Sequence, residues 1–453
     1  MLATLPPEFA ALYKALDTAD YEEAFALAIL QLEQPKTDQQ ALALASIFAL
    51  YGEEGVEGGL HCLNGCDKES DLFFALKAEF LAIEDSSKPP VKDMLAKAKK
   101  TKDALSLFHF ARAQYLLKAF RPAQRLMKKL NQEDLPPHLA WRYWSLKGEI
   151  SAQLGKAQDA AAAFEKALDL AHDRDKPSER LSLAECWLRM GYPERCLNEI
   201  DKGEAYAKQG HIVRDAYLRG VAQRQLSNYK LAFEHLQKAY TLAEANLPFE
   251  LFLELARLFA DTEQFQKAFE NYECALNSSP DGYENYVLHE YARVLREAEQ
   301  FEEAARALKR VVRQARYTNR AQAFADLAEV TYLLGNFDQV KPLAQFALKG
   351  GVVAPACLSL GRVALEYFRL DEAESWFEQA ISASTEGEMD WLSAELLLIE
   401  TFAQRIADAP EKLISHAERA LKYLHPQDDW VATLNEHVSS AKEQLEAKPR
   451  LLN

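Results

Sequence analysis

Two short stretches of the sequence carry residue types that could support catalysis. Gly155-Lys156 is a Gly-Lys pair of the kind found in phosphate-binding loops, but Ile150 stands where such a loop needs glycine. His289-Glu290 begins the pattern of a zinc-binding helix, but Arg293 stands where the second histidine ligand is needed. We therefore expect a protein that is not an enzyme.

Cysteine and histidine fall close together at His61, Cys62 and Cys66. A zinc site needs further ligands of this kind, and no second Cys/His pair has zinc-ligand spacing. Cys196 occupies a position that other copies of an internal repeat fill with alanine, which is typical of a small buried residue. The sequence predicts reduced structural thiols, no metal site and no cofactor.

A basic stripe lies between residues 306 and 320. Its members recur mostly every three or four residues along a predicted helix and the turn after it: Arg306, Lys309, Arg310, Arg313, Arg316 and Arg320. A stripe of this kind could contact phosphate groups or an acidic partner. The alternative is a solvated helix face whose long side chains only cover apolar surface.

The overall charge limits the classes of partner. The net charge of −16 disfavours non-specific binding to nucleic acid or to anionic membranes. Apolar residues form 49% of the chain and charged residues 27%, as in ordinary soluble proteins. No apolar run approaches the roughly 18 residues that a membrane span needs, and the N-terminal residues do not resemble a signal peptide. We expect a cytoplasmic protein without membrane insertion.

The elements that must position these residues come from an internal repeat. One small residue recurs at equivalent positions, namely Ala111, Gly148, Ala184, Gly220, Ala256, Ala292, Ala328 and Gly361. Subtraction of the residue numbers gives spacings of 37, 36, 36, 36, 36, 36 and 33. A period in this range is typical of solenoids built from helix pairs.

Each copy reads as two amphipathic helices joined by a tight turn. In the copy at residues 144–170, the first helix carries Gly148 and the second carries Ala160, Phe164 and Ala167 on one face. The small residues allow the two backbones to approach closely, and Phe164 is predicted to fill the space between hairpins. The glycine cluster at residues 52–59 predicts a loop or a short break.

The copy from Ala256 to Pro280 resembles the tetratricopeptide repeat family. It has the small residue, the aromatic Phe265, Ala268, the aromatic Tyr272, Ala275 and the closing proline in the family's order. The resemblance implies an all-α fold, a right-handed superhelical solenoid of stacked antiparallel helix pairs. We predict irregular N-terminal repeats over residues 1–104, regular repeats over 105–381, and a divergent repeat with a capping helix over 382–453. Asp429 to Lys448 is the predicted terminal helix.

The resemblance also implies that the first helices line a concave groove. The side chains that this would place on part of the inner wall are Arg214, Tyr217, Arg224, Arg257, Tyr286, His289, Arg293, Arg296, Tyr332 and Arg362. Arginine and tyrosine suit the recognition of an acidic or C-terminal peptide. The alternative is that these arginines pair with carboxylates of the same wall, and the candidates are Glu250, Glu297, Glu329 and Glu366.

The favoured function is a non-enzymatic scaffold or adaptor that binds a partner protein or an acidic peptide in its groove. A second hypothesis is a regulator in which a peptide ligand changes the superhelix and alters docking of another partner. A third, an RNA-associated repeat protein, depends only on the basic stripe. The sequence does not indicate the oligomeric state.

Overall fold

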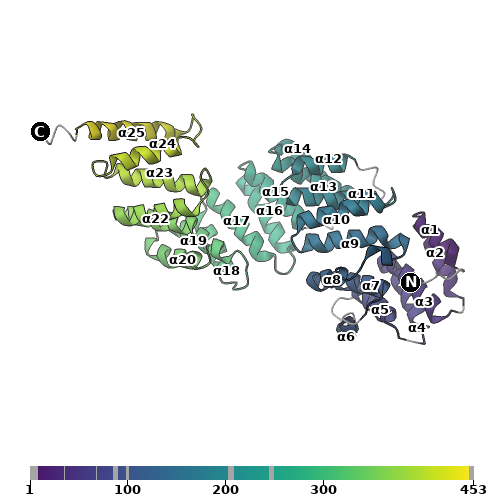
Figure 1. The fold of residues 1–453 in the computed structure, drawn as a ribbon. Coiled ribbons are helices and arrows are strands. Elements are labelled where there is room, and N and C mark those ends of the chain that lie inside the picture. Colours follow the sequence, from purple (N-terminus) through teal and green to yellow (C-terminus); the bar gives the residue numbers. More distant parts are fainter. Residues whose placement is uncertain are drawn as a thin grey trace. The chain divides into compact units, whose positions relative to one another are not determined.

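The computed structural model describes residues 9–34, 36–67, 69–84, 90–97, 101–202, 209–243 and 249–447. None of these residues lies in a β-strand, and successive helices pack as antiparallel pairs. The all-α stack of helix pairs predicted from the repeat is therefore confirmed. The chain divides into two compact units, Met1–Asn246 (unit 1) and Leu247–Asn453 (unit 2) (Figure 1). The boundaries predicted after residues 104 and 381 follow repeat regularity and remain predictions.

Unit 1 contains the helices from α1 to α14. The α-helices before residue 130 are α1 (Ala10–Asp17), α2 (Tyr21–Leu32), α3 (Asp38–Phe48), α4 (Val56–Asn64), α5 (Asp71–Glu84), α6 (Pro90–Lys97), α7 (Ala104–Leu116) and α8 (Phe120–Met127). They are followed by α9 (Ala140–Gln153), α10 (Ala157–Leu170), α11 (Lys176–Arg189), α12 (Pro193–Asp201), α13 (Gln209–Gln225) and α14 (Tyr229–Leu242). Short 3-10 helices are η2 (Ala49–Gly55), η3 (Gln132–Asp134) and η4 (Pro137–Leu139).

Unit 2 contains the helices from α15 to α25. Its helix pairs are α15 (Phe249–Asp261) with α16 (Phe265–Ser278), α17 (Glu284–Glu297) with α18 (Phe301–Val312), α19 (Arg320–Leu333) with α20 (Phe337–Lys349), and α21 (Ala354–Glu366) with α22 (Leu370–Ala383). The last elements are α23 (Met389–Ala403), α24 (Pro410–Ala420) and α25 (Asp429–Ala447). The helix predicted from Asp429 is confirmed in α25.

Close packing inside each pair explains the recurring small residue. A Cβ atom added at Gly148 of α9 would lie 2.8 Å from the ring of Phe164 in α10. Gly361 of α21 has the same relation to Phe377 of α22, at 2.3 Å. The aromatic ring of the second helix therefore occupies the space that a side chain of the first helix would need. Phe164 also belongs to an apolar cluster with Leu183 and Cys186 of α11, in agreement with its predicted place between hairpins.

The turn between the two helices has one fixed backbone conformation. The residue seven positions after the small residue has a positive φ in successive repeats, for example 73° at Gly155, 59° at Glu299 and 73° at Gly335. Its left-handed conformation ends the first helix and lets the chain reverse. The sequence supplies glycine at some of these turns and other residues at the rest.

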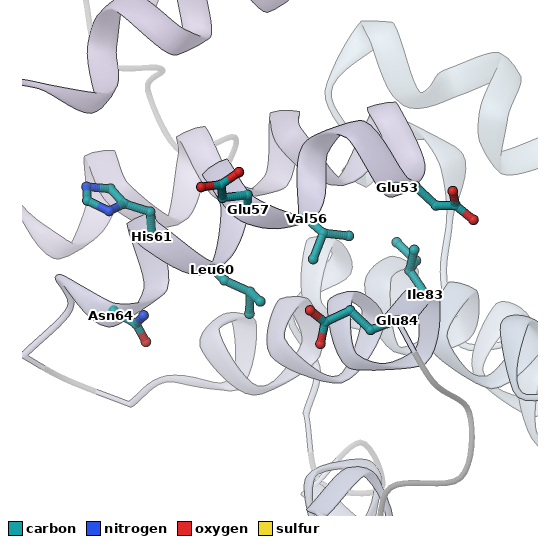
Figure 2. Close-up of a pocket in the computed structure, with 8 residues that line it drawn as sticks. All are labelled: Glu53, Val56, Glu57, Leu60, His61, Asn64, Ile83 and Glu84. Atoms are coloured by element: carbon teal, nitrogen blue, oxygen red, sulfur yellow. The ribbon is translucent and has the colours of Figure 1, made fainter.

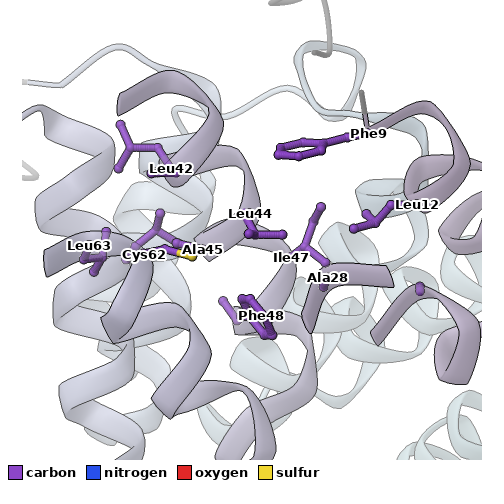
Figure 3. Close-up of a cluster of buried hydrophobic side chains, with 14 of the residues drawn as sticks. Phe9, Leu12, Ala28, Leu42, Leu44, Ala45, Ile47, Phe48, Cys62 and Leu63 are labelled. Carbon is purple, nitrogen blue, oxygen red and sulfur yellow. The ribbon is translucent and has the colours of Figure 1, made fainter. Parts of the chain in front are cut away.

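The N-terminal part of unit 1 has a continuous apolar core of its own (Figure 3). Phe9, Leu12, Leu44 and Phe48 are among its buried side chains. The prediction of a loop over residues 52–59 is wrong in its second half, because α4 begins at Val56. The glycine at position 59 allows close packing of α4 against α5, because a Cβ atom there would lie 2.1 Å from the ring of Phe80.

Candidate partner-binding surface

The first helices of unit 2 carry a row of ion pairs that connect one repeat to the next. Arg257 of α15 donates to both carboxylate oxygens of Glu290 in α17, with Nε–Oε2 at 3.0 Å and Nη2–Oε1 at 2.6 Å. The same guanidinium contacts Glu254 of its own helix and the hydroxyl of Tyr286, the latter at 2.7 Å. Arg257 is thus neutralised by two carboxylates, which raise its pKa against the opposing effect of burial.

A second group links α17, α19 and α21. Glu329 of α19 lies between two guanidinium groups, from Arg296 of α17 and from Arg362 of α21. Arg362 Nη1 is 3.4 Å from Glu329 Oε1, and its guanidinium carbon is 5.9 Å from the ring centroid of Tyr332. Tyr332 itself donates a hydrogen bond of 2.7 Å to Glu366. Two arginines therefore share one carboxylate here.

Arg293 differs from its equivalents in neighbouring repeats. It occupies the same position in α17 that Arg257 occupies in α15 and Arg362 in α21. Its side chain is exposed, and within the described part of the chain no carboxylate pairs with it. Tyr286, two helical turns before it, is 37% exposed. This part of α17 therefore presents an unpaired guanidinium, with a partly exposed aromatic ring two turns earlier in the helix.

His289, predicted as a groove residue, is instead part of the interior. It is 6% exposed, and its Nε2 lies 2.9 Å from Asp326 of α19. Its Nδ1 lies 3.0 Å from the hydroxyl of Tyr317. Both ring nitrogens are engaged, so the histidine connects two first helices rather than facing a ligand.

The predicted residues of unit 1 lie on α13. Arg214 donates to Glu185 of α11 at 2.7 Å and to Ser182 at 3.3 Å. It lines a cavity of about 180 Å³ together with Tyr115 and Glu149, among other residues. Burial raises the pKa of Glu149 and of Tyr115. Tyr217 and Arg224 are half-buried, and each has an interaction within the chain.

The predicted alternative of pairing along the wall is thus observed in part. Glu329 pairs with two arginines and Glu366 accepts a hydrogen bond from tyrosine. The other carboxylates that pair with predicted arginines were not among the candidates, and they are Glu185, Glu254 and Glu290.

The basic stripe is partly neutralised. Arg306 pairs with Glu303, Arg310 Nη2 lies 2.6 Å from Glu284 Oε1, and Arg320 donates to a backbone carbonyl. Three of its members are exposed and form no ion pair with a described residue: Lys309, Arg313 and Arg316. The stripe keeps a net positive charge, but only three of its six basic side chains are both exposed and without an ion pair in the described part of the chain.

Sequence reasoning missed a buried polar network in unit 1. His109 of α7 lies 2.7 Å from Ser46 of α3 and 2.7 Å from Glu79 of α5, and Arg112 reaches the second oxygen of Glu79 at 2.9 Å. The residue types are those of a hydrolytic triad, but Glu79 and His109 are fully buried and Ser46 is 7% exposed. The network joins three first helices. No local sequence signal could have found it, because Ser46, Glu79 and His109 are at least 30 residues apart from one another in the sequence.

A hollow of about 620 Å³ lies between α4 and the end of α5 (Figure 2). Glu53, Glu57 and Glu84 face it, with His61 at one end. Its acidic lining would repel an acidic peptide.

Among the described residues, no group of three histidine, cysteine or acidic side chains is arranged to hold a metal ion, and Cys62 is 4% exposed. Nor does the described chain include a helix with the length and apolarity of a membrane span.

Comparison with known families identifies one repeat directly. Residues 142–173, which include most of α9 and all of α10, match the family model described as Tetratricopeptide repeat. No curated protein sequence matches the chain.

Three solved structures are similar to the chain at low sequence identity. The first is a structure of pilF from Pseudomonas aeruginosa, with 18% sequence identity and a TM-score of 0.40. The match covers 52% of this chain and 99% of the pilF chain. The second is the Cut9–Hcn1 hetero-tetramer of the APC/C, with 13% sequence identity and a TM-score of 0.47. The match covers 96% of this chain and 96% of that chain. The third is a Rap protein complexed with competence and sporulation factor, with 15% sequence identity and a TM-score of 0.49. The match covers 76% of this chain and 96% of that chain. At these values none of them indicates a function for this chain.

Proposed function

The chain is a helical-repeat protein of the tetratricopeptide type, and on that premise we propose that it is a non-enzymatic scaffold that binds an acidic segment of a partner protein. The proposed site is the surface of α17, α19 and α21 in unit 2. The exposed, unpaired guanidinium of Arg293 is the observation that carries this proposal.

The charges around Arg293 support an acidic ligand. Of the three guanidinium groups of Arg293, Arg296 and Arg362, the last two pair with Glu329, and Arg293 pairs with no described carboxylate. Arg293 is therefore the guanidinium of the three that remains available to bind a carboxylate of the ligand. Arginine binds a carboxylate through two parallel hydrogen bonds, which favours acidic side chains or a C-terminus over neutral segments.

Aromatic side chains supply the apolar part of the proposed site. Tyr286 and Tyr332 lie near the arginines and are partly exposed. Phe368, in the turn after α21, is 80% exposed at a φ of 52°. Exposed aromatic rings next to arginine are typical of the residues that contribute most to peptide binding. Arg257 is excluded from the site, because its donors are already used by Glu254 and Glu290.

A peptide library tests the proposal without a known partner. Random peptides displayed on phage are selected on the full chain, on Arg293→Glu and on Lys341→Glu, an exposed charge reversal on the second helix α20. The expected result is enrichment of Asp- and Glu-rich peptides on the wild-type chain and on Lys341→Glu, with loss on Arg293→Glu. Enrichment of neutral or basic peptides, or equal binding to Arg293→Glu, would reject the site.

A further inference from the structure

A cavity of about 430 Å³ on unit 1 has a lining that is predominantly basic. It lies between α8, α9 and α10, whereas the surface proposed above for an acidic peptide belongs to unit 2. Its charged lining residues are Lys128, Lys147, Lys156, Lys166 and Asp159. Four ammonium groups therefore face one hollow that contributes a single carboxylate. The neutral polar side chains that line it are Gln124 and Ser151.

Two of the lysines are held against the same aromatic ring. The Nζ atom of Lys147 is 4.4 Å from the ring centroid of Trp144, and that of Lys166 is 4.3 Å from it. The indole N–H donates to Gln132 Oε1 at 3.0 Å, which fixes the orientation of the ring. The tryptophan therefore keeps two like charges close together through cation–π contacts.

The positive charges of these lysines are not neutralised by nearby carboxylates of the described residues, although the chain as a whole is acidic. Lys128, Lys147 and Lys166 form no ion pair with any described residue. Lys156 reaches Asp159 at 4.0 Å, and both side chains are largely exposed, so the pair contributes little. Burial and the neighbouring ammonium of Lys166 both lower the pKa of Lys147. Bringing the lysines together costs free energy that a bound anion would recover.

The beginning of α10 adds a second attraction for anions at the same place. Lys156 is the residue before this 14-residue helix, and Asp159 is in its first turn. No side chain accepts a hydrogen bond from the first N–H groups of α10. The N-terminus of a helix carries a partial positive charge and free N–H donors, which favour phosphate or sulfate groups.

We propose that this cavity is a binding site for a compact polyphosphate group, such as the phosphate chain of a diphosphate or triphosphate. Lysine binds phosphate as a compact point charge, and four lysines around one hollow suit an anion that carries several negative charges. A hollow of about 430 Å³ that is open to solvent has room for a short anion with several charges. The lysines already placed over Trp144 leave no basis for recognising a nucleobase there.

Calorimetric titration of the full chain with tripolyphosphate in 150 mM salt tests this proposal. We expect saturable binding of one tripolyphosphate per chain, weaker binding of pyrophosphate, and affinity lowered at least tenfold in Lys147→Gln/Lys166→Gln. The matched control is Lys230→Gln/Lys238→Gln, which removes two exposed charges from α14 of the same unit and should bind as the wild-type chain does. Absence of saturable binding, or an equal loss in both double variants, would overturn the proposal.

Two further measurements keep the test independent of folding. The melting temperature and helix content of each variant are measured first. If Lys147→Gln/Lys166→Gln is unfolded, Lys128→Gln/Lys166→Gln replaces it, because both of these lysines are exposed. Tripolyphosphate should also change the indole fluorescence of the wild-type chain, and Trp144→Phe should abolish this change. A fluorescence response that persists in Trp144→Phe would place the anion elsewhere and reject the cavity.

Discussion

The phenolic oxygen of Tyr21 in α2 lies 2.5 Å from the carboxylate of Asp175, although 154 residues separate them. The guanidinium carbons of Arg142 and Arg174 lie 5.1 and 5.5 Å from the centroid of the same tyrosine ring. In an ideal solenoid each repeat contacts only its neighbours. The N-terminal hairpin of α1 and α2 instead contacts the start of α9 and the residues before α11, so it closes back onto unit 1 (Figure 1).

Replacement of Tyr21 by phenylalanine tests this contact. It removes the hydrogen bond to a charged acceptor and keeps the ring, so the attachment of the hairpin should weaken by about 1–2 kcal/mol. Hydrogen exchange of the α1 and α2 amides should become faster, while α13 and α14 stay unchanged. The control is Tyr192→Phe, whose hydroxyl bonds to no described residue. Unchanged exchange in α1 and α2 would mean that the contact does not attach the hairpin.

Gly148→Ala tests the close approach inside a helix pair. The added methyl group would lie 2.8 Å from the Phe164 ring and force it to move, which should destabilise unit 1 by about 1–3 kcal/mol. Gly210→Ala is the matched control, because a Cβ atom there meets nothing within 4 Å and alanine favours the helix. The measurement is the urea midpoint of each variant. Equal midpoints would show that the pair has room for a side chain.

The periodic features of this chain could be predicted because they repeat. Gly148, Ala160 and Phe164 recur in type at fixed spacing, and periodic apolar residues determine which faces of two helices meet. The structure places Phe164 against Gly148 of its own pair and in one apolar cluster with Leu183 of the next pair. Helix pairing and the all-α class follow from such local patterns alone.

The polar contacts could not be predicted in the same way. The sequence left open whether Arg257 binds a ligand or pairs with a carboxylate of the wall, and its guanidinium binds Glu290, which was not among the candidate carboxylates. Which acid pairs with which arginine depends on side-chain rotamers and on the register between repeats, and periodicity specifies neither. The buried pair of His109 and Glu79 arises from contact between separate helices, and neither residue has a sequence signal of its own.

Substitution of Glu299 by glycine should stabilise unit 2. Glu299 has a φ of 59°, a conformation that costs a residue with a side chain about 1 kcal/mol more than glycine. Gly335 already occupies the equivalent turn of the next repeat. We expect a gain of about 0.5–1 kcal/mol in the free energy of unfolding. Glu378→Gly, at an exposed interior position of α22, should instead lose about 1 kcal/mol. A loss in both variants would contradict the strain assigned to this turn.

Glu179 of α11 should make unit 1 less stable as the pH rises. Its side chain is buried, one carboxylate oxygen accepts from Ser145 at 3.0 Å, and the other has no hydrogen-bond partner. Burial raises its pKa from 4.5 to about 8. Between these two values the folded chain keeps a proton that the unfolded chain releases, so stability falls from pH 4.5 towards pH 8.

Glu179→Gln removes this titration and keeps the shape of the side chain. At pH 4.5 the variant and the wild-type chain should have similar free energies of unfolding. At pH 8 the variant should be the more stable by on the order of a few kcal/mol. Urea unfolding at both pH values gives the comparison, with the exposed Glu165→Gln on α10 as the control. A difference between Glu179→Gln and the wild-type chain that stays constant between pH 4.5 and pH 8 would show that Glu179 is not protonated in the folded state.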